Sequence, residues 1–336
     1  MKSFKGWAAC GLAVLALTTV MATPASAQAV ITNGFGVALG INTLGEMNPA
    51  ALTIGGQLPY NADRVGLSFF TEYGSGTTAG PEWGDATSPG CYCEGYGVSA
   101  NGIAGYANVS SGTANLTGDS FISTASTATV VTHITTLPGL TITHEYRPST
   151  STSLYEAIVT LTNTTGVAMT DLRYNRTMDW DIPPTTFSEL VTIQGWPATA
   201  LIDSCNDGFA TSNPLVDCSG GMEDVNFTDV GPFDHGARFT FAFGSLAAGA
   251  SQTFKIFYGA ASTEAAILAA LASVGAEVYS LGQCSTTAPC PATFAFGFAG
   301  VGGTPVVFGA VPEPTTLVLL GTGLAAAAIR LRRRRR

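Results

Sequence analysis

Apolar and polar residues alternate with a period of two through much of the middle of this 336-residue chain. Such alternation is typical of half-buried strands, because successive side chains of a strand point to opposite faces of a sheet. Gly, Pro, Asn and Thr form turns between the alternating segments. The apolar positions of the clearest segments are Leu140, Ile142 and Tyr146; Ala157, Val159 and Leu161; Leu172, Tyr174 and Met178; Phe239, Phe241 and Phe243; Phe254, Ile256 and Tyr258; and Phe294, Phe296 and Phe298.

One segment has helical spacing instead. Ser262 is placed to cap a helix, and Glu264 lies in its first turn, where an acidic side chain is favourable. The apolar face consists of Ile267, Leu268, Leu271 and Val274. One helix among many strands predicts an all-β fold, namely a β-sandwich ectodomain with one short helical appendage.

The start of the chain predicts a secretory signal peptide over residues 1–27. A positive, an apolar and a small-residue region follow one another in the order that signal peptidase recognises. These regions are Lys2 and Lys5, then residues 6–20, then Ala25 and Ala27 just before the cleavage point at Gln28. We therefore expect export and processing by signal peptidase.

The last 26 residues, 311–336, read VPEPTTLVLLGTGLAAAAIRLRRRRR. Pro312, Glu313 and Pro314 precede an apolar run over residues 315–329, which gives about 23 Å of helix for a hydrocarbon core of roughly 30 Å. The arginines that follow favour the cytoplasmic side, so this transmembrane helix would leave the bulk of the chain outside.

This tail resembles the PEP-CTERM sorting signal. The resemblance implies insertion in the inner membrane, recognition at Pro312, Glu313 and Pro314 by an exosortase, and removal of the helix with its basic end. It also implies a membrane-anchored precursor and a mature protein at the cell surface or outside the cell. Similar tails also carry a name that refers to ice-binding proteins, which is inherited from some carriers and is no evidence of ice binding.

Between the two ends, we expect a β-sandwich ectodomain over residues 28–296 and a Gly-rich spacer over residues 297–310. The segment 154–193 resembles an uncharacterised ectodomain that recurs among carriers of this tail, and the resemblance implies no known activity. The sequence has no internal repeat of solenoid or propeller period.

Charge narrows the choice of partners. Eight of the 14 basic residues but only one of the 23 acidic residues lie in the end segments, so six basic residues face 22 acidic ones in the middle. A surface this acidic repels phosphate backbones, which argues against nucleic acid as a partner. Divalent cations are better suited to it.

Six cysteines remain after signal cleavage, and an even number in an exported chain predicts disulfides. The simplest pairing joins near neighbours along the chain. Cys91 and Cys93 then close a short ring, and zinc is the rival interpretation for these two. This simplest pairing, one of 15 connectivities, joins Cys205 with Cys218 and Cys284 with Cys290, and it leaves Cys91 and Cys93 either to pair with each other or to prove it wrong.

Asp179 and Asp181 are the most suggestive acidic pair. In a strand their carboxylates share one face, with Cα atoms about 7 Å apart, a spacing that suits a shared cation or an acid/base pair. A solvated strand end before Pro183 is the other interpretation. A second acidic group includes Asp203 and Asp207, and calcium is the candidate ion for both groups.

Three classes of function remain open. The sequence has three histidines and no G-x-S-x-G, H-E-x-x-H or P-loop pattern, which favours a non-enzymatic envelope or matrix protein. A secreted glycosidase-like hydrolase using Asp179 and Asp181 is the second. The third is a carbohydrate-binding module for exopolysaccharide using Trp83, Trp180 or Trp196, although burial in the sandwich is the expected place for these rings and for His144.

Overall fold

The computed structural model describes residues 28–50, 52–60, 62–71, 80–109, 111–286 and 290–308. Three antiparallel sheets form within these ranges, together with one helix. Every segment that alternates with period two in the sequence lies within a strand. The all-β class is therefore confirmed.

Two large sheets make up most of the domain. In spatial order, the nine-stranded sheet consists of β14 (Phe227–Phe233), β12 (Glu189–Gln194), β17 (Val278–Cys284), β18 (Thr293–Ala299), β16 (Ser251–Ala261), β10 (Leu154–Asn163), β9 (Leu137–Pro148), β8 (Ala128–Ile134) and β7 (Leu116–Ser123). The five-stranded sheet consists of β13 (Leu201–Cys205), β15 (His235–Leu246), β11 (Met169–Trp180), β5 (Glu94–Ala100) and β6 (Ile103–Ala107).

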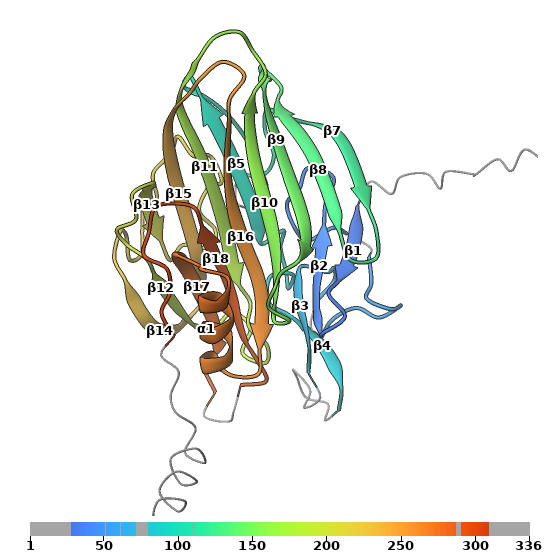
Figure 1. Cartoon of the computed structure of the whole chain (residues 1–336). Helices are drawn as coiled ribbons and strands as arrows, with labels where there is room; N and C mark the ends of the chain where they lie inside the picture. Colours follow the sequence, from blue (N-terminus) through green and yellow to red (C-terminus); the bar gives the residue numbers. More distant parts are fainter. Residues whose placement is uncertain are drawn as a thin grey trace, which may run out of the picture.

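The two large sheets pack face to face, as Figure 1 shows. Phe239 and Phe241 of β15 meet aromatic rings of β18 across the interface, and Phe241 lies 4.7 Å from Phe298 between ring centroids. These rings are fully buried, and burial of such side chains is a main source of folding free energy. The predicted β-sandwich and its alternating core positions are thus present.

A third, four-stranded sheet lies along one flank of the sandwich (Figure 1). It consists of β1 (Ala29–Thr32), β2 (Val37–Ile41), β3 (Leu67–Thr71) and β4 (Glu82–Asp85). Phe69 of β3 packs edge-on against Phe294 of β18, with ring centroids 6.5 Å apart. One face of the small sheet therefore extends the main core, and a separate small cluster of Ala38, Ile54 and Val65 packs on the sheet as well.

Helix α1 (Glu264–Ser273) packs against β16 and β18 on the outer face of the nine-stranded sheet (Figure 1). Its N-cap is Thr263, whose hydroxyl accepts a hydrogen bond from the Ala266 N–H. The cap therefore lies one residue after Ser262, where the sequence predicted it. Ile267 and Leu271 are buried against Phe257. Among the described residues, no helix has the length and apolar character needed to cross a membrane.

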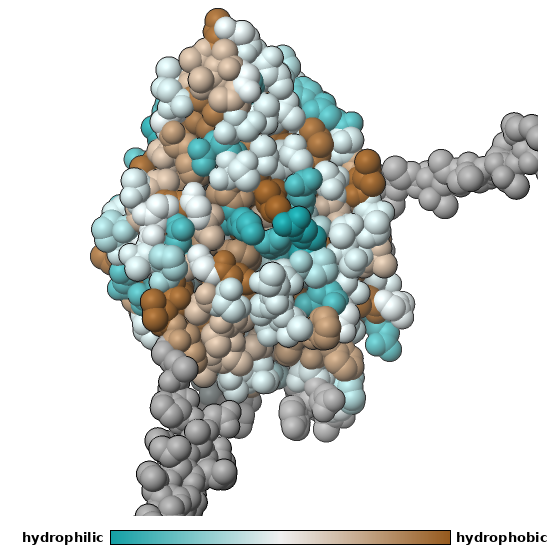
Figure 2. All heavy atoms as spheres, in the orientation of Figure 1, coloured by the Kyte–Doolittle hydropathy of each residue, from teal (hydrophilic) through white to brown (hydrophobic). Residues whose placement is uncertain are grey.

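The outer face of the nine-stranded sheet also carries an ion-pair triad. Glu156 of β10 lies 2.6 Å from Arg147 of β9 and 2.9 Å from Lys255 of β16. Hydrophilic side chains gather over these strands in Figure 2. This part of the face is therefore solvated.

Three disulfides join the described cysteines in the pairing predicted from the sequence. They are Cys91–Cys93, Cys205–Cys218 and Cys284–Cys290, with sequence separations of 2, 13 and 6 residues. The second of these closes the longest loop and ties the end of β13 to the segment that follows it.

Residues 297–299, predicted as the start of a Gly-rich spacer, belong to strand β18 in the structure. Strand β18 continues to Ala299, because Gly297 and Phe298 pair with both β16 and β17. Beyond the strand, the Glu277 carboxylate accepts hydrogen bonds from the N–H groups of Gly300, Val301 and Gly303. The predicted signal peptide (residues 1–27) and the predicted sorting tail with its transmembrane helix (residues 311–336) lie outside the described residues.

Candidate metal centre

Asp179 and Asp181 lie at the end of β11, in the five-stranded sheet. Alternation along this strand turns Met178 and Trp180 into the core between the sheets, where the Trp180 indole N–H donates to the Ser280 hydroxyl. Asp179 therefore lies on the opposite, outer face of the strand. Asp181 follows directly after the strand, with its backbone N–H bonded to the Ala86 carbonyl.

A loop over residues 206–218 covers this outer face. Gly208 lies directly on Asp179, so close that an added Cβ would come within 2.4 Å of its Oδ1 atom. The Arg238 guanidinium of β15 fastens the loop, because it donates to the carbonyl oxygens of Thr211, Asn213 and Val216. The Cys205–Cys218 disulfide closes the loop at its base.

The side chains of both aspartates are inaccessible to solvent, with an exposed fraction of 0 %. Neither Asp179 oxygen accepts a hydrogen bond from any described residue, and the same holds for Oδ1 of Asp181. The interpretation of Asp179 and Asp181 as a solvated strand end is therefore wrong. It failed because the covering loop comes from a distant part of the sequence.

Burial and neighbouring negative charge act together on these carboxyl groups. Loss of solvent raises the pKa of Asp179 to about 8, and Asp234 and Asp207 add to the rise. Loss of solvent also raises the pKa of Asp181 to about 10, with further contributions from Asp179 and Glu189. All of these neighbours are acidic, so the ionised pair has no compensating charge among them.

The nearest imidazole does not supply that charge. Burial lowers the pKa of His235 to about 4, which leaves the ring neutral at physiological pH. Its backbone N–H donates to Oε1 of Glu189, whose own pKa burial raises to about 8. The other Glu189 oxygen has no hydrogen-bond donor among the described residues.

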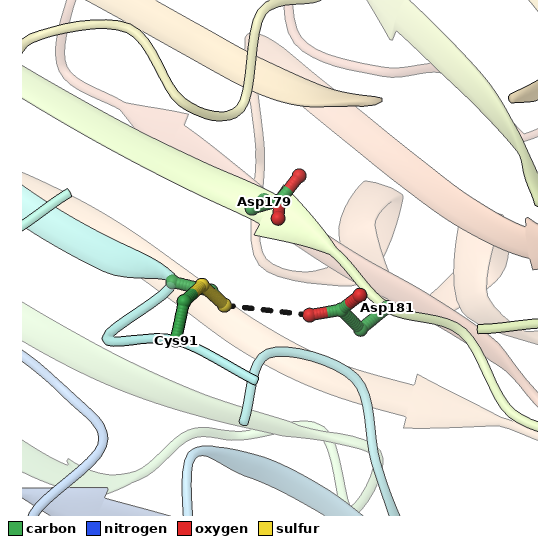
Figure 3. Close-up of side chains that lie close together, drawn as sticks. Cys91, Asp179 and Asp181 are labelled. Carbon is green, nitrogen blue, oxygen red and sulfur yellow. Dashed lines mark hydrogen bonds between the residues drawn. A yellow bond between two sulfur atoms is a disulfide. The ribbon is translucent and has the colours of Figure 1, made fainter. Parts of the chain in front are cut away.

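The Cys91–Cys93 disulfide borders the two aspartates. Sγ of Cys93 lies 3.4 Å from Oδ2 of Asp181, and Figure 3 shows that carboxylate pointing at the disulfide. The two sulfur atoms and one carboxylate oxygen from each aspartate all lie within 4.8 Å of one another. The sequence suggested metal binding at the cysteines and at the aspartates separately, and the structure brings these four residues together.

The structure separates the other two predicted ligands. Asp203 forms a buried ion pair with Arg238 and accepts a hydrogen bond from the Cys218 N–H, so its oxygens are already engaged. Asp207 accepts a hydrogen bond from the Phe209 N–H within the covering loop, and its charge reaches Asp179. Neither residue belongs to the group of close ligand atoms around Asp179.

A surface pocket of about 180 Å³ lies beside the disulfide. Cys91 is partly exposed and lines this pocket together with Tyr92, Asn108, Val109 and Phe209, whereas Cys93 is fully buried. Val109 has a φ of 56°, a left-handed conformation that is rare for a β-branched residue. The pocket gives Cys91 a route to solvent.

The three tryptophans proposed for sugar binding differ in exposure. Trp180 is fully buried, as expected for a sandwich core. Trp196 is partly buried against the main core. Trp83 is partly exposed and lines a second pocket, of about 290 Å³, with Phe70, Thr32, Gly34 and Gly36.

Sequence reasoning missed a second buried ionic cluster, on the inner face of β11. Arg176 forms an ion pair with Glu94, and both side chains have an exposed fraction of 0 %. The guanidinium also donates to the hydroxyls of Tyr174 and Tyr146. His144 lies beside it, hydrogen-bonded to Tyr174 as a buried core histidine. The signal was Arg176 itself, a charged residue at an inward position of an alternating strand.

Comparison with known families identifies one match. Residues 310–335 match the PEP-CTERM protein-sorting motif. No curated protein matches the chain. The tail is therefore a PEP-CTERM sorting tail, and it indicates a secreted protein that is first anchored in the membrane and then processed by an exosortase.

Proposed function

We propose that this chain is a non-enzymatic protein of the cell envelope or extracellular matrix whose β-sandwich ectodomain binds calcium at Asp179 and Asp181. The proposal depends on one observation. Asp179 is fully buried, and neither of its carboxylate oxygens has a hydrogen-bond donor among the described residues.

A buried carboxylate without a partner is costly, and proteins normally pair such a charge or use it to bind a metal. Here the neighbours of Asp179 and Asp181 are acidic, and His235 is neutral. A divalent cation would supply the missing positive charge. Calcium prefers oxygen ligands, and backbone carbonyls and water commonly complete its set of six to eight.

The same burial argues against the hydrolase alternative. A glycosidase needs its two carboxyl groups on either side of a sugar in an open cleft. Asp179 lies beneath the covering loop, both carboxyl groups are fully buried, and neither residue lines the two pockets described above. Burial of the pair supports a binding role.

A second candidate function, carbohydrate recognition, is favoured by the pocket at Trp83. Phe70 is 39 % exposed and packs edge-on against Trp83, with ring centroids 5.4 Å apart. Partly exposed aromatic rings beside glycines offer a surface for sugar stacking. Exopolysaccharide is the polymer with which to test this pocket, by comparing retention of the chain with that of a Trp83→Ala variant.

Calcium binding is tested by thermal and denaturant unfolding of the oxidised chain in calcium and in chelator. Calcium at 100 times its dissociation constant should add about 2.7 kcal/mol to the free energy of unfolding. Asp179→Asn should abolish this gain. Glu145→Gln, which removes one exposed charge from β9, is the matched control and should keep it. Equal stability of the unchanged chain in calcium and in chelator would contradict calcium binding.

Sorting is tested by mass spectrometry of the protein from its native host. We expect Gln28 at the start and no peptide from Leu317 onward, whereas a host without an exosortase should retain the tail. Substitution of Glu313 by Ala should also leave the tail in place. An intact segment 317–329 in mature protein from the native host would reduce the tail to a plain membrane anchor.

A further inference from the structure

The four ligand atoms around Asp179 form a mixed set of two sulfurs and two oxygens. They come from the loop before β5 and from the end of β11, and all lie within 4.8 Å of one another. Two thiolates and two carboxylates make up a four-coordinate set of the kind that zinc binds, with metal–sulfur bonds of about 2.3 Å and metal–oxygen bonds of about 2.0–2.2 Å. The oxidised centre offers only the oxygens, because each sulfur is bonded to the other.

We propose that reduction of the Cys91–Cys93 disulfide converts this centre into a zinc site with Cys91, Cys93, Asp179 and Asp181 as ligands. The inference rests on the proposed function in that the same two carboxylates serve both states. The redox state of the cysteines then selects the ion. The oxidised centre suits a hard cation such as calcium, and the reduced centre suits zinc, which accepts thiolate ligands.

The conversion needs a small dithiol as reductant. One thiolate of the dithiol attacks Sγ of Cys91, the sulfur–sulfur bond breaks, and Cys93 leaves with the electron pair. The second thiol of the dithiol then attacks the mixed disulfide, which releases Cys91 and leaves the dithiol as a cyclic disulfide. Zinc next binds both cysteine sulfurs as thiolates, and their protons pass to solvent.

Access to the two sulfurs fits this order of events. Cys91 is partly exposed and lines the pocket of about 180 Å³, so an incoming thiolate reaches its sulfur first. Cys93 is fully buried beside Asp181 and is the leaving sulfur. The same pocket gives a metal ion a route to the centre once the disulfide has opened.

Only this disulfide has the required neighbours. Within the described ranges, no other group of three or more histidine, cysteine or acidic residues brings its ligand atoms this close together. Cys205 and Cys218 lie at the base of the covering loop, and Cys284 and Cys290 lie at the end of β17. The ligand atoms of those two pairs belong to no such close group among the described residues, which makes the two pairs internal controls.

Cobalt(II) is the probe, because it takes zinc sites and absorbs light. The full-length chain is reduced with a dithiol, desalted without oxygen and titrated with cobalt. We expect a sulfur-to-cobalt charge-transfer band that saturates at about one equivalent and disappears on addition of zinc. The oxidised chain should show no such band. Absence of the band in the reduced chain, with free Cys91 and Cys93 verified by alkylation, would overturn the proposal. The proposal would also be overturned if these two cysteines could not be reduced in the folded chain.

Substitutions assign the ligands. The pair Cys91→Ser and Cys93→Ser should remove the band, and the matched pair Cys284→Ser and Cys290→Ser should keep it. Asp179→Asn should weaken cobalt binding without removing the sulfur band. If reduction unfolds the chain, zinc should restore the β-sheet circular dichroism of the unchanged chain but not that of the first pair. A band in the first pair, or equal recovery in both, would contradict the proposal.

The zinc inference and the calcium proposal can fail separately. The calcium experiment uses the oxidised chain and reads stability, and the cobalt experiment uses the reduced chain and reads a sulfur band. A cobalt band without any calcium effect would refute calcium binding and support the zinc site. A calcium effect without a cobalt band would support calcium binding and refute the zinc site.

Discussion

The two faces of β11 bury charge in opposite ways. On the inner face, Arg176 is paired with Glu94, and two tyrosine hydroxyls and the Gly45 carbonyl accept its remaining hydrogen bonds. On the outer face, three residues further along, Asp179 has acidic neighbours and no hydrogen-bond donor among the described residues. Both side chains have an exposed fraction of 0 %.

The inner cluster contains its own cation, and the outer cluster does not. Burial raises the pKa of Glu94, but Arg176 opposes the rise, so the protein itself compensates the buried charge. At Asp179 the neighbouring charges Asp234 and Asp207 push the pKa in the same direction as burial. The outer cluster therefore needs protons or a metal ion, and this need makes it the candidate site.

The largest expected effect follows from breaking the inner cluster. Arg176→Met leaves Glu94 buried without its partner, and we expect a loss of about 3–5 kcal/mol in the free energy of unfolding by denaturant. Arg173→Met on the same strand is the control, because Arg173 pairs with Asp171 at the surface and should cost about 1 kcal/mol or less. Equal losses in the two variants would mean that the inner pair is not a buried ion pair.

The outer cluster should make the free energy of unfolding depend on pH. In chelator, the folded protein keeps protons on Asp179 and Asp181 that the unfolded chain loses near its ordinary pKa of 3.8. Because the unfolded state then binds fewer protons, stability falls as pH rises toward about 8 at Asp179 and about 10 at Asp181. From pH 6 to pH 7 we expect a loss of up to about 1.4 kcal/mol for each carboxyl.

Two variants check the source of this slope by denaturant unfolding at each pH. Asp179→Asn should remove about half of it, because an amide has no proton to lose in this range whereas Asp181 still does. Glu145→Gln, at an exposed position of β9, should not alter it. Calcium should flatten the slope of the unchanged chain as well, and a slope that calcium leaves unaltered would argue against a cation at this centre.

The smallest effect concerns Glu46, which lies beside the inner cluster. Burial raises its pKa to about 7, although Asn108 donates a hydrogen bond to Oε1 and lowers it in part. Stability should therefore fall as pH rises from about 4.5 to about 7. Glu46→Gln should reduce the difference in unfolding free energy between pH 6 and pH 7 by roughly 1 kcal/mol. An unchanged difference would place the titration elsewhere.

Local sequence patterns predicted a large part of this structure. Alternation identified the strands and the buried Trp180 and His144, because these follow from which face of a strand a residue occupies. Spacing along the chain also predicted the disulfide pairs. These features depend on neighbours close in sequence.

The candidate site depends on contacts between distant segments, and local patterns do not contain these. Cys93 and Asp181 are 88 residues apart and meet because β5 pairs with β11. Burial of Asp179 depends on the loop that Arg238 fastens. The acidic residues near it in the sequence made Asp203 a candidate metal ligand, and its ion pair with Arg238 could be recognised only in three dimensions.

The Glu277 carboxylate, which holds residues 300–303, also limits the reach of the tail. Val306 is still bonded to the domain through the Ala276 carbonyl, so five residues separate this last attachment from Pro312. The six Cα-to-Cα steps from Val306 to Pro312 span at most about 22 Å when fully extended. A protease that cuts at the Pro-Glu-Pro sequence must therefore bind within that distance of the folded domain. A protease whose active site is recessed more deeply than this would clash with the domain before it reached the cleavage site.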